Sequence, residues 1–95
     1  ENPRDCAIRE LKEETGYSAK NIKLIHKFFT SAGFSNQKIY IFLATGLNKG
    51  EPEFDEDEII EKYEIDINEA RNMVINNEIE DAKTAIGILL AKELI

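Results

Sequence analysis

Four charged residues near the start of the chain have the types and spacing of a divalent-metal site. Glu10 and Glu14 stand four residues apart, and Arg9 and Glu13 repeat this interval one position earlier. In a helix the interval puts each pair on one face, so Arg9 can pair with Glu13 while Glu10 and Glu14 repel each other. A hard cation such as Mg²⁺ would neutralise the two carboxylates together. A solvated acidic face is the alternative on charge pattern alone.

A second concentration of carboxylates lies at residues 55–58, which read Asp-Glu-Asp-Glu. Such a run is most often solvated charge. It does not fit an EF-hand loop, because counting from Asp55 places Ile60 at the position that requires glycine. A loop between two strands could fold over the carboxylate face of the first helix and add a metal ligand or a general base.

The elements that must position these acids follow from local sequence signals. Pro3 suits a first helical turn and Gly16 supplies a stop, which predicts a helix over about 4–15. Clusters of β-branched and aromatic residues predict strands over 21–29 and 38–44. The remaining expectations are a loop over 45–57, a strand over about 59–65, a helix from Asp66 to about 76 and a last helix from about Asp81. This order predicts an α/β layered domain.

Composition excludes several classes of protein. With 95 residues, 42% of them apolar and 33% charged, the chain fits one soluble globular domain. No apolar run is long enough to cross a bilayer, and the first residues lack the basic-then-apolar order of a signal peptide, so we expect no membrane partner. The formal charge of −7 opposes nucleic-acid binding. A single cysteine, Cys6, cannot form an internal disulfide, which favours a cytoplasmic location.

The segment from Arg9 to Tyr17, R-E-L-K-E-E-T-G-Y, resembles the R-E-U-x-E-E-x-G-U core of the Nudix hydrolase signature, where U is apolar. Glu1 stands where that signature has an earlier glutamate. The signature's opening glycine would lie six residues before Glu1, so the resemblance implies that residues 1–95 are the C-terminal portion of a single Nudix domain whose N-terminal portion is absent. The implied fold is a partial Nudix-type α/β/α sandwich, a mixed sheet with flanking helices.

Two further segments resemble bacterial ADP-ribose pyrophosphatases, a branch of that family. Residues 55–61 match D-E-D-E-x-I-E, and residues 79–84 match I-x-D-A-K-T. Two positions depart from the branch. Ala32 stands where a proline is usual, which leaves the exact substrate open, and Gln37 stands where an acid is usual, which removes one charge from the cleft.

The resemblance also implies a role for each acid. It assigns metal binding to Glu10, Glu14 and Glu58, and catalytic roles to Glu56, Glu13 and Arg9. Glu56 would be the general base and Glu58 a further ligand, although the two roles can be exchanged. Glu13 would be a ligand or near-ligand oriented by Arg9, and Glu1 a structural helper near the helix start.

The predicted activity is Mg²⁺-dependent hydrolysis of ADP-ribose to AMP and ribose 5-phosphate by a homodimer, with Mn²⁺ as a substitute cation. The alternatives are another nucleoside diphosphate derivative, such as a nucleotide sugar, and a non-catalytic Nudix-fold binding module. The 95-residue chain by itself is expected to be inactive. His26 is interpreted as a strand residue and Cys6 as a packing residue.

Overall fold

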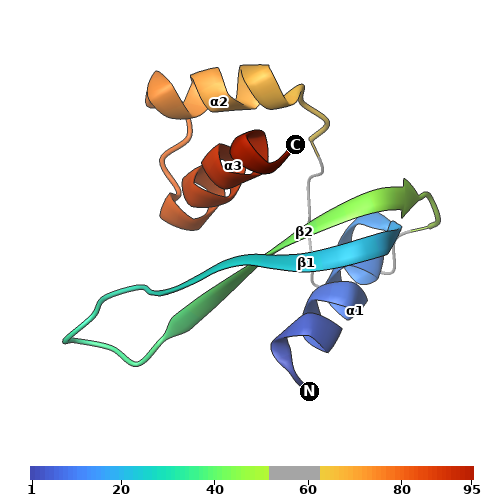
Figure 1. Cartoon of the computed structure of the whole chain (residues 1–95), viewed down its shortest axis with the longest axis horizontal. Helices are drawn as coiled ribbons and strands as arrows, with labels where there is room; N and C mark the ends of the chain where they lie inside the picture. The colour runs from blue at the N-terminus through green and yellow to red at the C-terminus, as the bar shows by residue number, and fades with distance from the viewer. Residues whose placement is uncertain (52–62) are drawn as a thin grey trace. The chain divides into compact units, whose positions relative to one another are not determined.

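The computed structural model describes residues 1–51 and 63–95 (Figure 1). Contacts group the chain into two compact units, Glu1–Lys62 and Tyr63–Ile95. In chain order the elements are α1 (Pro3–Thr15), β1 (Ser18–Phe29), β2 (Lys38–Asn48), α2 (Ile67–Ile75) and α3 (Ala82–Leu94). The predicted α/β class is confirmed.

Helix α1 begins and ends where the sequence signals place it. The side chain of Asn2 accepts a hydrogen bond from the Asp5 amide at 2.8 Å and so caps the first turn. Pro3 follows at the first helical position, where its missing N–H group has no intrahelical partner to lose. At the other end Gly16 has a left-handed backbone with φ of +81°, which ends the helix. The predicted helix over 4–15 is confirmed.

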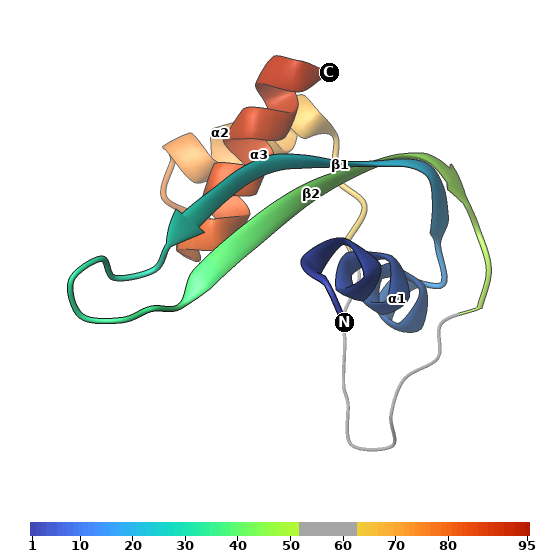
Figure 2. The same ribbon diagram turned by 60° about the horizontal axis from the view of Figure 1, so that its bottom comes forward.

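The two strands of the first unit form an antiparallel hairpin. Pairing runs from Ser18 opposite Asn48 to Phe29 opposite Lys38, and a bulge interrupts it between Leu24 and His26. Figure 2 shows the twisted pair passing over α1, which lies against one face of the hairpin. The hairpin therefore supports the acidic helix and brings the chain after β2 back to the C-terminal end of α1.

The hairpin is longer than the sequence signals indicate. β2 continues to Asn48, so the predicted loop over 45–57 is wrong at its first four residues. Glycine and asparagine favoured a loop there, but Thr45 and Leu47 still pair with β1. Gly46 is accommodated by a positive φ of +66° within the pair. Cross-strand hydrogen bonding thus outweighs the local preference of the residues.

The predicted third strand over 59–65 can be compared with the structure only at its last three residues. Residues 59–62 lie outside the described residues, and residues 63–65 are not in a strand. Pairing among the described residues is therefore confined to β1 and β2. These two strands are antiparallel, so the described residues do not include the parallel pair that the expected mixed sheet requires.

The second unit contains α2 and α3, which begin at Asp66, the predicted cap, and at Asp81, the predicted start of the last helix. The Asp66 carboxylate accepts from the amides of Asn68 and Glu69 at 3.0 and 3.3 Å. Asp81 accepts from the amide and the hydroxyl of Thr84 at 3.0 and 2.7 Å. Both caps satisfy amide groups that have no partner inside the helix, which confirms the predicted starts of these helices.

Little of the described chain is fully enclosed. Among residues 1–51 and 63–95, only Gly16 and Ala70 are buried, and Phe34 at the hairpin tip is 96% exposed. No helix within these ranges is long and apolar enough to cross a membrane. The described residues therefore do not enclose a large hydrophobic core of their own.

We predict that the Asp81 cap makes stability depend on pH. The Thr84 hydroxyl and the nearby Lys83 ammonium lower the pKa of Asp81 to about 2. Ionised Asp81 should therefore stabilise the fold above its unfolded pKa of about 3.9, and this contribution should be lost as the pH falls toward 2. Thermal unfolding of Asp81→Asn followed by circular dichroism should show a Tm below wild type at pH 6, with the difference vanishing near pH 2. Exposed Glu80→Gln is the control, and an equal effect at both pH values would contradict the assignment.

Candidate functional site

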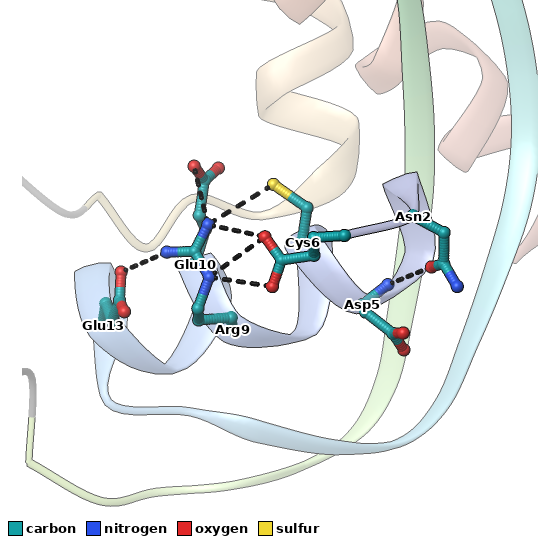
Figure 3. Close-up of polar contacts among 7 residues, drawn as sticks. Asn2, Asp5, Cys6, Arg9, Glu10 and Glu13 are labelled. Carbon is teal, nitrogen blue, oxygen red and sulfur yellow. Dashed lines mark hydrogen bonds and ion pairs between the residues drawn. The ribbon is translucent and has the colours of Figure 1, made fainter.

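The charged face of α1 is organised by one guanidinium group. Arg9 donates from Nε and Nη2 to the two carboxylate oxygens of Glu1, at 3.0 and 2.9 Å (Figure 3). Its Nη1 donates to Glu13 Oε2 at 2.9 Å. The predicted Arg9–Glu13 pair is present, and Glu1 is a second, bidentate partner. Arg9 thus holds two carboxylates that are separated by twelve positions in the sequence.

Glu10 lies at the edge of this network. Its Oε1 is 4.0 Å from Arg9 Nη2, at the limit of an ion pair, and its side chain is 52% exposed. Because Arg9 already donates to Glu1 and Glu13 at shorter distances, Glu10 keeps most of its capacity to accept other partners. It is therefore available to a cation approaching from solvent.

The network shifts the ionisation of its members. Hydrogen bonds from Arg9 lower the pKa of Glu1 below its usual value. The same bonds to Glu1 and Glu13 raise the pKa of Arg9 above its already high value. Partial removal from water and the negative charges of Glu10 and Glu1 raise the pKa of the Cys6 thiol. Cys6 therefore stays protonated, in agreement with a packing role rather than a nucleophilic one.

The donor set on α1 suits a hard divalent cation only in part. Glu10 and Glu14 stand four residues apart on the helix and so share a face. Two carboxylates are what Mg²⁺ commonly takes from a protein when substrate phosphates supply further oxygens. Within the described ranges no group of three His, Cys, Asp or Glu side chains is placed to hold a metal. The other two predicted site residues, Glu56 and Glu58, lie outside those ranges.

The hairpin register returns the chain to the carboxylate-bearing end of α1. Ser18 pairs with Asn48 in the outermost rung of the ladder. Two positions further along the same register, Gly16 stands opposite Gly50, and their backbones are in close contact. Glu14 precedes Gly16 by two residues, and the acidic run at 55–58 follows Gly50 by five. The hairpin thus brings Gly50 to the end of the helix that carries Glu13 and Glu14.

A shallow groove adjoins Glu10 on the face between α1 and β2. Its volume is about 240 Å³, and it is lined by Pro3, Cys6, Ala7 and Glu10 of α1 and by Lys38, Ile39, Tyr40 and Phe42 of β2. Lys38 Nζ lies 5.3 Å from the Phe29 ring centroid and 6.0 Å from that of Tyr40. The lining of the groove therefore includes one anionic side chain, Glu10, and one cationic side chain, Lys38.

The two departures from the pyrophosphatase pattern lie in the turn of the hairpin. Ala32 is exposed there. Gln37 closes the turn, because its backbone oxygen accepts from the Thr30 amide at 3.1 Å and its Oε1 accepts from the Thr30 hydroxyl at 3.3 Å. Gln37 thus has a structural role in this chain. Sequence reasoning did not find that role, nor that of Gly50, because both depend on the pairing register.

Comparison with known proteins assigns the family. Residues 1–85 match the NUDIX domain. The chain is 44% identical over 90 residues to an ADP-ribose pyrophosphatase of Bacillus subtilis (strain 168), which covers 93% of this chain and 49% of that protein. It is 39% identical over 90 residues to a methanol dehydrogenase activator of Bacillus methanolicus, with the same coverage. A GDP-mannose pyrophosphatase of Yersinia enterocolitica is 32% identical over 95 residues, covering 97% of this chain and 50% of that protein.

The chain belongs to the Nudix family. Its similarity to proteins named as ADP-ribose pyrophosphatases, the second from Mycobacterium tuberculosis, confirms the resemblance inferred from the sequence. The chain spans about half the length of the curated relatives that it matches. The partial Nudix fold expected from Arg9, Glu10, Glu13 and Glu14 is likewise confirmed.

We predict that Arg9 controls the ionisation of Glu1. Arg9→Ala should raise the pKa of the Glu1 carboxyl toward its ordinary value, because the bidentate hydrogen bond is lost. Arg9→Lys should restore the lowered pKa only partly, since an ammonium lacks the planar fork of a guanidinium. Carboxyl chemical shifts followed by NMR titration measure the effect, with Arg4→Ala as the control on the same helix. An unchanged Glu1 pKa in Arg9→Ala would refute the assignment.

Proposed function

We propose that the protein containing this chain hydrolyses the pyrophosphate bond of ADP-ribose to AMP and ribose 5-phosphate, with Mg²⁺ as the cofactor and Mn²⁺ as a substitute. The observation that carries the proposal is the Arg9 network, which fixes Glu13 while leaving Glu10 exposed on the same helix. The similarity to ADP-ribose pyrophosphatases favours this substrate among nucleoside diphosphate derivatives.

Each residue has a defined part in the proposed reaction. When bound, a divalent cation would neutralise the diphosphate oxygens and make water a better nucleophile. Glu10 and Glu14, on one face of α1, would bind this cation, and Glu58 would be a further ligand. Glu56 takes the proton of the attacking water as general base. Arg9 orients Glu13, because a carboxylate held by a guanidinium loses much of its rotational freedom.

We further propose that residues 1–95 are the C-terminal portion of a single Nudix domain and that the whole protein is a cytoplasmic homodimer. The domain assignment is supported by the exposure of large apolar side chains in both units, such as Phe29 at 53% and Ile75 at 58%. Such surfaces are normally covered in a complete fold. On this view the chain alone is inactive, because catalysis needs groups held to a fraction of an ångström.

Two other functions are each favoured by a relative. The GDP-mannose pyrophosphatases favour a nucleotide sugar as substrate. The methanol dehydrogenase activator is named for its effect on another enzyme, which favours a regulatory module. The group Arg9, Glu10, Glu13 and Glu14 argues for an enzyme, because a purely regulatory domain has no chemical need for two like charges at positions 10 and 14.

Glu14→Gln tests the metal assignment. In the full-length protein that contains this chain, we expect Glu14→Gln to lower Mg²⁺-dependent turnover by roughly a hundredfold or more. The substitution removes the charge of a ligand and keeps the size of the side chain. Circular dichroism should show an unchanged fold. Glu93→Gln, which removes an exposed carboxylate from the end of α3, is the matched control and should be fully active. Wild-type turnover by Glu14→Gln would exclude Glu14 as a ligand.

A substrate panel tests the assigned reaction. We expect kcat/KM for ADP-ribose to exceed that for GDP-mannose by about tenfold or more, since a site that pairs with one base leaves polar groups unpaired with another. Release of AMP, measured by chromatography, identifies the bond that is cleaved. A preference for GDP-mannose would replace the proposed substrate with a nucleotide sugar, and the absence of turnover on every substrate would favour the regulatory module.

A further inference from the structure

The groove between α1 and β2 contains a positive charge that the motif on α1 does not explain. Lys38, the first residue of β2, lines the groove together with Tyr40 and Phe42. Side chains at alternate positions of a strand project from the same face, and α1 lies against one face of the hairpin (Figure 2). The Lys38 side chain therefore leaves β2 on the face that borders the groove, and it is exposed to solvent.

No acid neutralises this ammonium group within the part of the chain that the structure describes. The ion pairs of these residues involve Arg9 and Lys83 but not Lys38. Lys38 Nζ instead lies over two aromatic rings, 5.3 Å from the centroid of Phe29 and 6.0 Å from that of Tyr40. Such rings hold an ammonium group in place but do not cancel its charge. Lys38 therefore keeps the capacity to bind an anion.

The surrounding sequence also favours an anion at this place. Residues 17–50 contain five lysines and no aspartate or glutamate, in a chain whose formal charge is −7. Lys27 pairs with Tyr40 across the hairpin, so a second lysine projects from the face that carries Lys38. Two positive side chains on one face of an acid-free hairpin attract an anionic group.

The size and lining of the groove indicate which anion it can accept. Its volume of about 240 Å³ lies below the range of roughly 300–1,000 Å³ that is typical of sites enclosing a drug-sized ligand. The groove can thus take only one part of a nucleoside diphosphate derivative. Ala7, Ile39 and Phe42 in its lining have no polar side-chain group for the hydroxyls of a sugar, whereas Lys38 has three N–H donors for phosphate oxygens. The diphosphate is therefore the part that matches the lining.

We propose that Lys38 is a substrate-binding residue, whose ammonium group donates hydrogen bonds to the diphosphate of a nucleoside diphosphate derivative. The inference rests on the proposed function in taking such a compound as the substrate, and it adds a phosphate contact outside the motif on α1. Because Glu10 lines the same groove, the diphosphate would bind between the proposed cation ligand on α1 and the ammonium group on β2. A lysine suits this role, since its charge on a flexible stem can follow the phosphate oxygens.

A metal-free titration of the full-length protein that contains this chain tests Lys38 directly. Inorganic pyrophosphate is titrated by calorimetry in the presence of EDTA. We expect Lys38→Met to weaken pyrophosphate binding by about tenfold, because it keeps the stem and removes only the charge, and we expect Lys38→Arg to retain the binding. The difference between Lys38→Met and wild type should shrink as the salt concentration rises from about 0.05 M to 1 M, because exposed charges are screened.

Lys23→Met is the matched control on the same hairpin. Lys23 pairs with Leu43, and the side chains of Leu43 and Phe42 project from opposite faces because the two residues are consecutive in β2. Lys23 is exposed like Lys38 but does not border the groove. The Lys23→Met variant should therefore bind pyrophosphate as wild type does.

A measurement on the unaltered protein complements the variants. Pyrophosphate should shift the NMR resonances of Lys38 and Tyr40 and leave those of Lys23 unchanged, which decides the proposal even if Lys38→Met fails to fold. Wild-type affinity in folded Lys38→Met, an equal loss in Lys23→Met or unshifted Lys38 resonances would overturn the proposal. So would an unchanged KM for ADP-ribose in Lys38→Met, because Lys38 would then bind an anion other than the substrate. The titration needs neither a divalent cation nor turnover, so an inactive wild type would refute the proposed function while the titration still decides whether Lys38 binds a diphosphate.

Discussion

The antiparallel register of β1 and β2 determines which parts of this chain can meet. A hairpin brings together residues that are far apart in sequence only if its strands pair without slipping, and a slip of one residue would turn every side chain to the other face. Here the rungs from Ser18–Asn48 inward fix the register, and Gly16 and Gly50 follow as its continuation. Hydrogen bonds between two strands thus bring Gly50 to the C-terminal end of α1, the helix that carries Arg9, Glu10, Glu13 and Glu14.

Electrostatic interactions act over shorter distances, between side chains on α1 and next to it. Arg9 is shared by three acids, Glu1 before the helix and Glu10 and Glu13 on it, at distances from 2.9 to 4.0 Å. The shorter distances identify Glu1 and Glu13 as the close partners of Arg9, whereas Glu10 lies at the limit of an ion pair. All members are substantially exposed, so the network orders side chains more than it stabilises the fold.

The sequence predicts those features that depend on neighbouring residues. The bounds of α1 follow from Pro3 and Gly16, and the starts of α2 and α3 follow from Asp66 and Asp81, because helix caps are local hydrogen bonds. The Arg9–Glu13 pair is likewise predictable from helical spacing.

What depends on pairing at long range could not be predicted. The loop signals at 45–48 were overridden by a ladder whose partners lie 24 to 30 residues earlier, from Asn21 opposite Thr45 to Ser18 opposite Asn48. The requirement for glycine at position 50 and the turn-closing role of Gln37 became visible only once the register was known. The bidentate bond from Arg9 to Glu1 depends on how the chain enters α1, which helical spacing alone does not define.

The bulge between Leu24 and His26 has a consequence for how the molecule behaves at high concentration. On β1 the half-buried side chains recur at every third residue, at Ala19, Ile22, Ile25 and Phe28, instead of at every second. A strand with this pattern is coiled, so the backbone groups on its edge away from β2 do not lie along a straight line. Another strand could align with only a short part of such an edge. The irregularity therefore protects a long, exposed hairpin against the edge-to-edge stacking that leads to fibrils.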